Sequence, residues 1–161
     1  MDLSPSLLSS LKRLRLFHEL SPNQIKRIFA ICRQRSLLAG EVLCKAGAES
    51  DRMYVILTGT IEVISPNGTE LAREEGVTTT GETGVLSGEV RSATVRVVDP
   101  VTALEIERLP LLRIMQDDGG LAVRLYRNAM ILVREKLMAA DRRLEEALAR
   151  LATVGPEEKG A

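Results

Sequence analysis

The spacing of apolar residues changes along the chain and divides it into helical and extended segments. Leucines recur at roughly helical intervals over residues 6–18 and predict a first short helix. A second helix is predicted from Pro22 to about Arg35, because Ser21 can cap its first turn and Gln24 can complete a capping box. Two short helices are therefore expected before any strand.

Beyond these helices the apolar runs become short and are separated by glycine, which is typical of strands. We expect Met53–Leu57 and Thr60–Ser65 to form a hairpin joined through Thr58-Gly59, with the next turn at Pro66-Asn67-Gly68. Repeated short strands with close turns predict a mainly β fold with flanking helices. The expected form is an antiparallel β jelly-roll barrel, since closure removes exposed strand edges.

The strand pattern ends near Glu107, and helical patterns follow it. A short helix is predicted over residues 109–116, and the polar, glycine-containing residues 117–120 interrupt it. Residues 121–151 contain no Gly or Pro, and apolar residues recur there in alternating steps of three and four. These seam residues are Val123, Tyr126, Met130, Val133, Leu137, Ala140, Leu144, Ala147 and Leu151. We interpret the seam as a parallel homodimeric coiled coil; the alternative is a long helix packed back on its own domain.

These patterns predict one domain with an appendage, as a length of 161 residues allows. Residues 1–120 would form the N-terminal helices and the barrel, residues 121–152 a lid and dimerisation helix, and residues 153–161 a flexible tail. Met1 and the polar tail favour a stand-alone protein over a fragment. Hydrophobic residues make up 45% of a chain without Trp, so the core must consist of aliphatic side chains and Met.

Composition argues against several classes of function. The acidic middle of the chain lies between basic flanks, which favours helices that neutralise the barrel over a nucleic-acid patch. Cys32 and Cys44 form no CxxC motif, and His18 is the one histidine, so no metal site is expected. Two thiols without a signal peptide predict the cytoplasm, and the apolar run 130–133 is too short to span a bilayer, so no membrane association is expected.

The candidate chemistry lies in residues 81–95. Gly81-Glu82 and the later run Arg91-Ser92-Ala93-Thr94-Val95 match, in identity and spacing, the phosphate-binding cassette of the cyclic nucleotide-binding domain family, which the chain resembles. The resemblance extends from about Leu14 to Leu137. It implies that the ligand is a cyclic nucleotide, cAMP or cGMP, with no cofactor, and that Gly81, Glu82, Thr83, Arg91, Ser92 and Ala93 contact it.

Physical chemistry explains why these residue types are suitable. Glycine at 81 lets backbone N–H groups of a short helix approach a phosphodiester, and Arg91 supplies a guanidinium fork for its oxygens. Glu82 can accept the ribose 2′-hydroxyl proton, and Ser92 can donate to phosphate or contact the amine of a syn guanine. The alternatives are that Glu82 merely caps the helix and that Arg91 pairs with Glu89 on the surface.

Two departures from the family pattern lie beside the cassette. Thr78-Thr79-Thr80 replaces a bulky residue before Gly-Glu, and Val90 replaces a proline before the arginine. Neither removes a phosphate ligand, so binding is expected to survive. For the base, the resemblance implies barrel side chains on one face, for which Val63 and Leu71 are candidates, and the terminal helix on the other, where Arg134 is the candidate.

No nucleophile lies beside a base and no metal set is present, so we expect no enzyme activity. The expected function is a switch, in which the ligand draws the cassette inward, a hinge at 115–121 follows, and the terminal helix signals to a protein effector. The pattern ends near Leu151 without room for a winged helix-turn-helix, so direct DNA binding is not expected. Two alternatives stay open: a ligand-free scaffold or dimerisation module, and a sensor of a cyclic dinucleotide.

Overall fold

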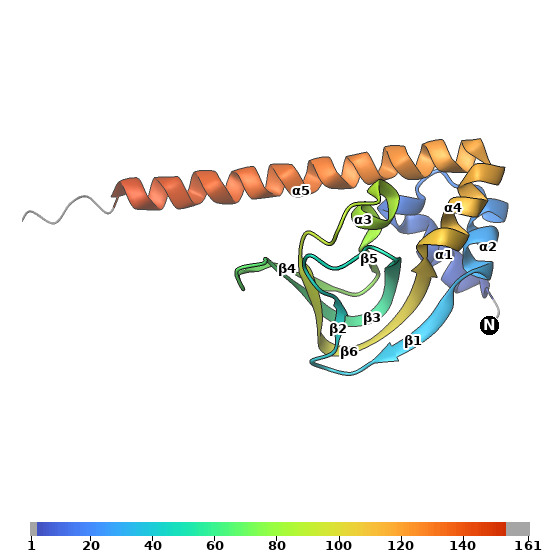
Figure 1. The fold of residues 1–161 in the computed structure, drawn as a ribbon, viewed down its shortest axis with the longest axis horizontal. Helices are drawn as coiled ribbons and strands as arrows, with labels where there is room; N and C mark the ends of the chain where they lie inside the picture. The colour runs from blue at the N-terminus through green and yellow to red at the C-terminus, as the bar shows by residue number, and fades with distance from the viewer. Residues whose placement is uncertain (1–2, 154–161) are drawn as a thin grey trace, which may run out of the picture.

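The computed structural model describes residues 3–153 and places a curved antiparallel sheet below a long terminal helix (Figure 1). The helical elements are α1 (Pro5–Arg13), the 3₁₀ helix η1 (Arg15–Phe17), α2 (Pro22–Ala30), α3 (Glu82–Ser87), α4 (Arg108–Asp117) and α5 (Gly119–Thr153). The strands are β1 (Arg33–Leu37), β2 (Val42–Cys44), β3 (Arg52–Ile64), β4 (Glu70–Glu75), β5 (Thr78–Thr80) and β6 (Thr94–Glu107). Helices α1, α2 and α4 gather at one end of the sheet, while α5 runs across it and beyond it.

Two long strands, β3 and β6, organise the sheet. They pair with each other; β6 also pairs with β1 and β2, and β3 also pairs with β4 and β5. Every pairing is antiparallel. The predicted fold class, mainly β with flanking helices and a long C-terminal helix, is confirmed.

The predicted hairpin at Thr58-Gly59 is wrong, because β3 runs through these residues as one strand. The register against β6 shifts on both sides of Thr58 and again before Ile61, so the pairing is irregular here, as at a β-bulge, but the chain does not reverse. Gly59 has a φ of 93°, and a Cβ there would collide with the carbonyl group of Pro100 on β6. Glycine at this position therefore bends a long strand, while the predicted turn before β4 does form over residues 66–68.

The second helix is also shorter than predicted. Its N-terminus has the expected capping box between Ser21 and Gln24, but α2 ends at Ala30. Residues from Arg33 onward form β1 instead, whose register places Arg33 opposite Glu105 of β6. Cross-strand ion pairs favour this polar segment as a strand, since Arg33 bonds Glu107 at 2.9 Å and Arg35 bonds Glu105 at 3.3 Å.

The start of α5 is fixed to the N-terminal helices. Leu121 and Leu125 are buried in the helical core, and the amide of Asn128, 1% exposed, donates to the carbonyl oxygens of Leu16 (3.0 Å) and His18 (2.8 Å). Asp118 accepts the backbone N–H of Leu121 and so caps the first turn. The first third of α5 is therefore held by both packing and hydrogen bonds.

The predicted seam lies on another face of α5 and is exposed. Val123, Met130, Leu137, Leu144 and Leu151 are each at least 58% exposed. The alternative, a long helix packed back on its own domain, applies to Leu121, Leu125 and Asn128 at the start of α5. It does not apply to these five seam residues. Within residues 3–153, no helix combines the length and the apolar character needed to cross a membrane.

Candidate functional site

The cassette between β5 and β6 begins with a left-handed glycine. Gly81 has a φ of 81° and precedes the six-residue helix α3, which Gly88 ends with the same φ. Val85 and Leu86 of this helix are buried, and Arg108 of α4 donates to the carbonyl of Val85 at 3.0 Å. The cassette is thus fixed to the helical end of the core, although a threonine run precedes it.

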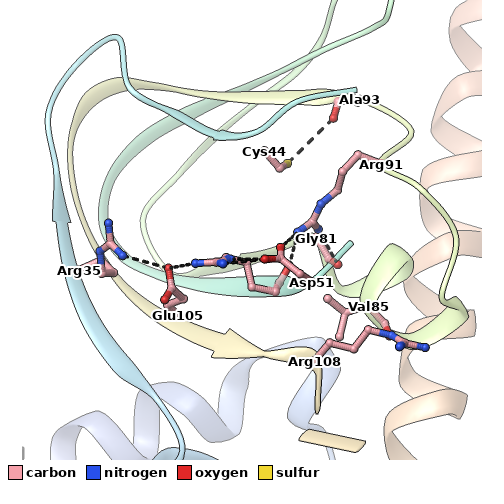
Figure 2. A network of polar contacts seen from close by, with 10 residues as sticks. Arg35, Cys44, Asp51, Gly81, Val85, Arg91, Ala93, Glu105 and Arg108 are labelled. Atoms are coloured by element: carbon pink, nitrogen blue, oxygen red, sulfur yellow. Dashed lines mark hydrogen bonds and ion pairs between the residues drawn. The ribbon is translucent and has the colours of Figure 1, made fainter. Parts of the chain in front are cut away.

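Arg91, near the end of the cassette, has a side chain that is only 4% exposed. Its Nη1 donates to the carbonyl of Gly81 at 3.2 Å, and its Nη2 donates to the carbonyl of Arg52 (Figure 2). A Cβ on Gly81 would lie 2.5 Å from Nη1, so glycine at this position makes room for the guanidinium. The surface pairing with Glu89 considered from the sequence does not form, because Arg91 turns inward to backbone acceptors.

A series of ion pairs extends from Arg91 through Asp51 and Arg52 to Glu105 (Figure 2). Asp51 lies 3.8 Å from the guanidinium of Arg91 and 2.6 Å from that of Arg52, which also reaches the buried Glu105 at 3.2 Å. The hydrogen bond from Arg52 holds the pKa of Asp51 below its ordinary value. Because Arg52 forms an ion pair with this carboxylate, the negative charge of Asp51 is already partly compensated without Arg91.

Glu82 is a buried acid at the first position of α3. It is 1% exposed; its Oε1 accepts a hydrogen bond from Lys136 Nζ of α5 at 2.8 Å, while its Oε2 has no hydrogen-bond partner among the described residues. A buried carboxylate oxygen without a donor is energetically costly, which marks it as able to accept a further hydroxyl or N–H group. The idea that Glu82 only caps a helix does not account for this oxygen or for the pair with Lys136.

A cavity of about 510 Å³ lies between the sheet, the cassette and α5. The sheet contributes Cys44, Val63, Leu71, Ala72, Glu74 and Thr80; the cassette contributes Gly81, Thr83, Gly84, Ser87, Glu89, Val90, Arg91, Ser92 and Ala93; and α5 contributes Lys136, Ala139, Ala140 and Arg143. Burial raises the pKa of the Cys44 thiol, so this wall carries a neutral group. The cavity size is that of a small-molecule site.

The structure brings most of the predicted site residues together. The cavity is lined by seven of them, Gly81, Thr83, Arg91, Ser92, Ala93, Val63 and Leu71. Glu82 does not itself line the cavity, but it bonds Lys136, which does. The prediction for Arg134 is wrong: it is exposed, does not line the cavity and, among the described residues, forms no hydrogen bond or ion pair with a residue that does. A step of two residues rotates a helix by about 200°, so Arg134 faces away when Lys136 faces the site.

Sequence reasoning missed Lys136 and Arg143. Together with Ala139 and Ala140 they recur at i, i+3, i+4 and i+7, which is one face of a helix. This face carries two cations with two small residues between them, a pattern that leaves room for a ligand beneath a helix. The spacing of these residues was a usable signal, but the longer hydrophobic seam on the neighbouring face, which shares Ala140, is the stronger pattern in the sequence.

Comparisons with known proteins identify the family of this domain. Residues 34–118 match the family model of the cyclic nucleotide-binding domain. The chain is 36% identical over 91 residues to the cyclic nucleotide-gated potassium channel mll3241 of Mesorhizobium japonicum, a match covering 56% of this chain and 25% of the channel. The chain therefore spans about a quarter of the length of that relative.

Solved structures share the fold. The N-terminal domain of a transcriptional regulator from Streptomyces coelicolor has a TM-score of 0.67 and 26% identity, covering 78% of this chain and 93% of that one. The regulatory domain of Toxoplasma gondii PKA, crystallised with cAMP, has a TM-score of 0.64 and 20% identity, covering 69% and 44%. Since the family match extends over more than half of the sequence, the chain belongs to the cyclic nucleotide-binding domain family.

Proposed function

We propose that this chain is a receptor for a cyclic mononucleotide, cAMP or cGMP, which it binds in the cavity beneath α5 without chemically changing it. The observation that carries the proposal is Arg91, an arginine whose side chain is 4% exposed and which lines the cavity together with the N-terminus of α3. A buried guanidinium beside glycine-rich backbone matches a single phosphodiester charge. Its hydrogen-bond partners are two neutral carbonyls, and Asp51, 3.8 Å away, is already paired with Arg52, so a phosphate would be a stronger partner for this guanidinium.

The ribose would meet Glu82. Its Oε2 is buried and unpartnered among residues 3–153, so a 2′-hydroxyl would supply the missing donor. Thr83, Ser92 and Ala93 would surround the phosphate, and Val63 and Leu71 would contact the base from the sheet. On the side of α5, we propose that Lys136 and Arg143 contact the ligand, in place of Arg134.

Binding would be transmitted through α5. Lys136 and Arg143 connect this helix to α3 and to the carbonyl of Leu71 on β4, so a ligand that engages Glu82 or β4 changes the contacts that hold the helix. The resulting shift can be no larger than the difference in ligand affinity between the two helix positions. The moved helix would then change either a homodimer formed through the exposed seam or the binding of a protein effector. We propose that this takes place in the cytoplasm and without direct DNA binding.

The test is calorimetric titration of the full chain with cAMP, cGMP and cyclic dinucleotides, beside the variant Glu82→Ala. We expect one mononucleotide to bind with 1:1 stoichiometry, and Glu82→Ala to weaken it by about tenfold or more through the lost ribose contact. Binding of a cyclic dinucleotide, with no binding of either mononucleotide, would support the alternative that the chain is a sensor of a cyclic dinucleotide. Absence of heat with every nucleotide, together with an unchanged melting temperature, would leave the domain as a scaffold.

A further inference from the structure

Strand β4 presents an acidic side chain to the cavity. Ala72 and Glu74 both line it and lie two residues apart, which places them on the same face of the strand. Glu74 is half-buried, and the hydroxyl of Thr78 donates to its Oε2 at 2.7 Å. Among the described residues this is the one hydrogen bond that engages the carboxylate, so the side chain is oriented while Oε1 keeps its accepting capacity.

Arg143 of α5 contacts the same strand, β4. Arg143 lines the cavity, and its Nη1 donates to the carbonyl of Leu71, three residues before Glu74 on β4. The phosphate ligands proposed above belong to the cassette, between β5 and β6. A nucleotide with its phosphate on Arg91 would therefore direct its base toward the β4 wall, where one acceptor and one donor group are available.

The two purines differ in what they offer such a wall. Guanine carries the N1–H and N2–H₂ donors side by side, and the acceptors O6 and N7 on its other edge, which are the atoms that arginine binds. Adenine places its N6–H₂ donor beside the N1 acceptor, so a carboxylate spanning that edge would meet a lone pair. A carboxylate that receives two N–H groups makes the paired, charge-assisted arrangement, which adds specificity as well as affinity.

We propose that Glu74 is the residue that selects the base, by accepting N1–H and N2–H₂ of guanine, with Arg143 on the O6 and N7 edge. The inference rests on the proposed function and makes it specific: the preferred ligand class is a guanine cyclic mononucleotide.

The experiment measures dissociation constants of the full chain for cGMP, cIMP and cAMP. Inosine keeps O6 and N1–H but lacks the 2-amino group, so cIMP isolates the N2–H₂ contact. The variant is Glu74→Gln, which keeps size and removes the charge; the control is Glu75→Gln on the same strand, an exposed residue outside the cavity. Melting temperatures of both variants show whether they fold as the wild type does.

We expect the wild type to bind cGMP at least tenfold more tightly than cIMP and cAMP. Glu74→Gln should weaken cGMP about tenfold, reduce the ratio of cGMP to cIMP affinity toward one, and leave cAMP within about twofold; Glu75→Gln should change none of these values. Equal or tighter binding of cAMP by the wild type, or equal weakening of all three ligands in Glu74→Gln, would overturn the base assignment and leave the receptor intact. Failure of all three to bind would overturn the receptor itself.

Discussion

Lys136 of α5 donates a hydrogen bond of 2.8 Å to Glu82 of α3. This ion pair joins the long terminal helix to the residue that we propose binds the ribose. The acid is 1% exposed, whereas the lysine side chain is 56% exposed. The charge of Glu82 is therefore balanced by a cation that belongs to α5. Any ligand group that bonds Glu82 changes the environment of the contact that positions α5.

Replacing Lys136 with glutamine should loosen this part of α5. We expect the free energy of unfolding to fall by about 1–2 kcal/mol, because Glu82 loses its cation while the exposed lysine gave up only part of its hydration. Backbone amides near Lys136 should exchange with deuterium faster, while those beside Asn128 stay protected. Arg134→Gln, on the opposite side of the same helix, is the control and should change neither measurement. Equal effects of the two substitutions would show that the ion pair does not hold the helix.

Gly59→Ala should destabilise the sheet much more than Gly68→Ala. Both glycines have positive φ values, 93° and 89°, but a Cβ at Gly59 would collide with the Pro100 carbonyl, whereas nothing lies within 4 Å at Gly68. Backbone strain alone predicts about 1 kcal/mol at Gly68, and the added collision predicts about 3 kcal/mol or more at Gly59. Urea denaturation of both variants measures the difference, and similar losses would contradict the bent-strand description of β3.

These two positions also illustrate what the sequence can and cannot predict. The turn at Gly68 was predictable because Asn and Gly adjoin each other between two strand patterns. At Gly59 the same reasoning predicted a hairpin, since the sequence does not distinguish a glycine that reverses the chain from one that admits a neighbouring carbonyl. That distinction depends on Pro100, which lies 41 residues away in sequence and next to Gly59 in space.

The cassette could be predicted from residue identities, whereas the helix side of the site could not. Gly81, Glu82 and Arg91 act through local backbone geometry and side-chain chemistry that their spacing encodes. Which face of α5 meets the cavity depends on how Leu121, Leu125 and Asn128 fix the start of the helix against η1. A rotation of the helix by one residue would replace Lys136 at the cavity with another side chain, so this register could not be predicted without the tertiary packing.

The first turn of α5 should respond to acid through Asp118. Its hydrogen bond from the Leu121 N–H, then that from Gln24, lowers the pKa of this carboxyl below 3.8, with Arg27 of α2 and Arg124 of α5 nearby. A lowered folded-state pKa stabilises the fold above about pH 4 and loses that contribution as the pH falls through the folded value. The melting temperature of the wild type should therefore exceed that of Asp118→Asn at pH 6, with the gap narrowing toward pH 3. A gap that is independent of pH would contradict this assignment.

The exposed seam of α5 should mediate self-association. We expect the wild type to sediment as a dimer and the double variant Leu137→Glu, Leu144→Glu to sediment as a monomer. The two leucines are 60% and 58% exposed, and each would pack against the same residue of a second copy in a parallel coiled coil, where glutamates would repel each other. Arg142→Glu, on the far side of the helix from Leu144, should leave the dimer intact. A monomeric wild type at all concentrations tested would remove the dimer from the proposal.

The most direct test of the receptor itself is calorimetry of Arg91→Lys beside Arg96→Lys, with cAMP and cGMP. Arg96 pairs with Glu62 at 2.6 Å and lies outside the cavity, so the same substitution there controls for the loss of a guanidinium elsewhere. A lysine at 91 keeps the charge but loses the planar fork, and should weaken binding by about tenfold to a hundredfold, while Arg96→Lys leaves the dissociation constant within about twofold. Equal affinities of wild type and Arg91→Lys for the bound nucleotide would contradict the phosphate site.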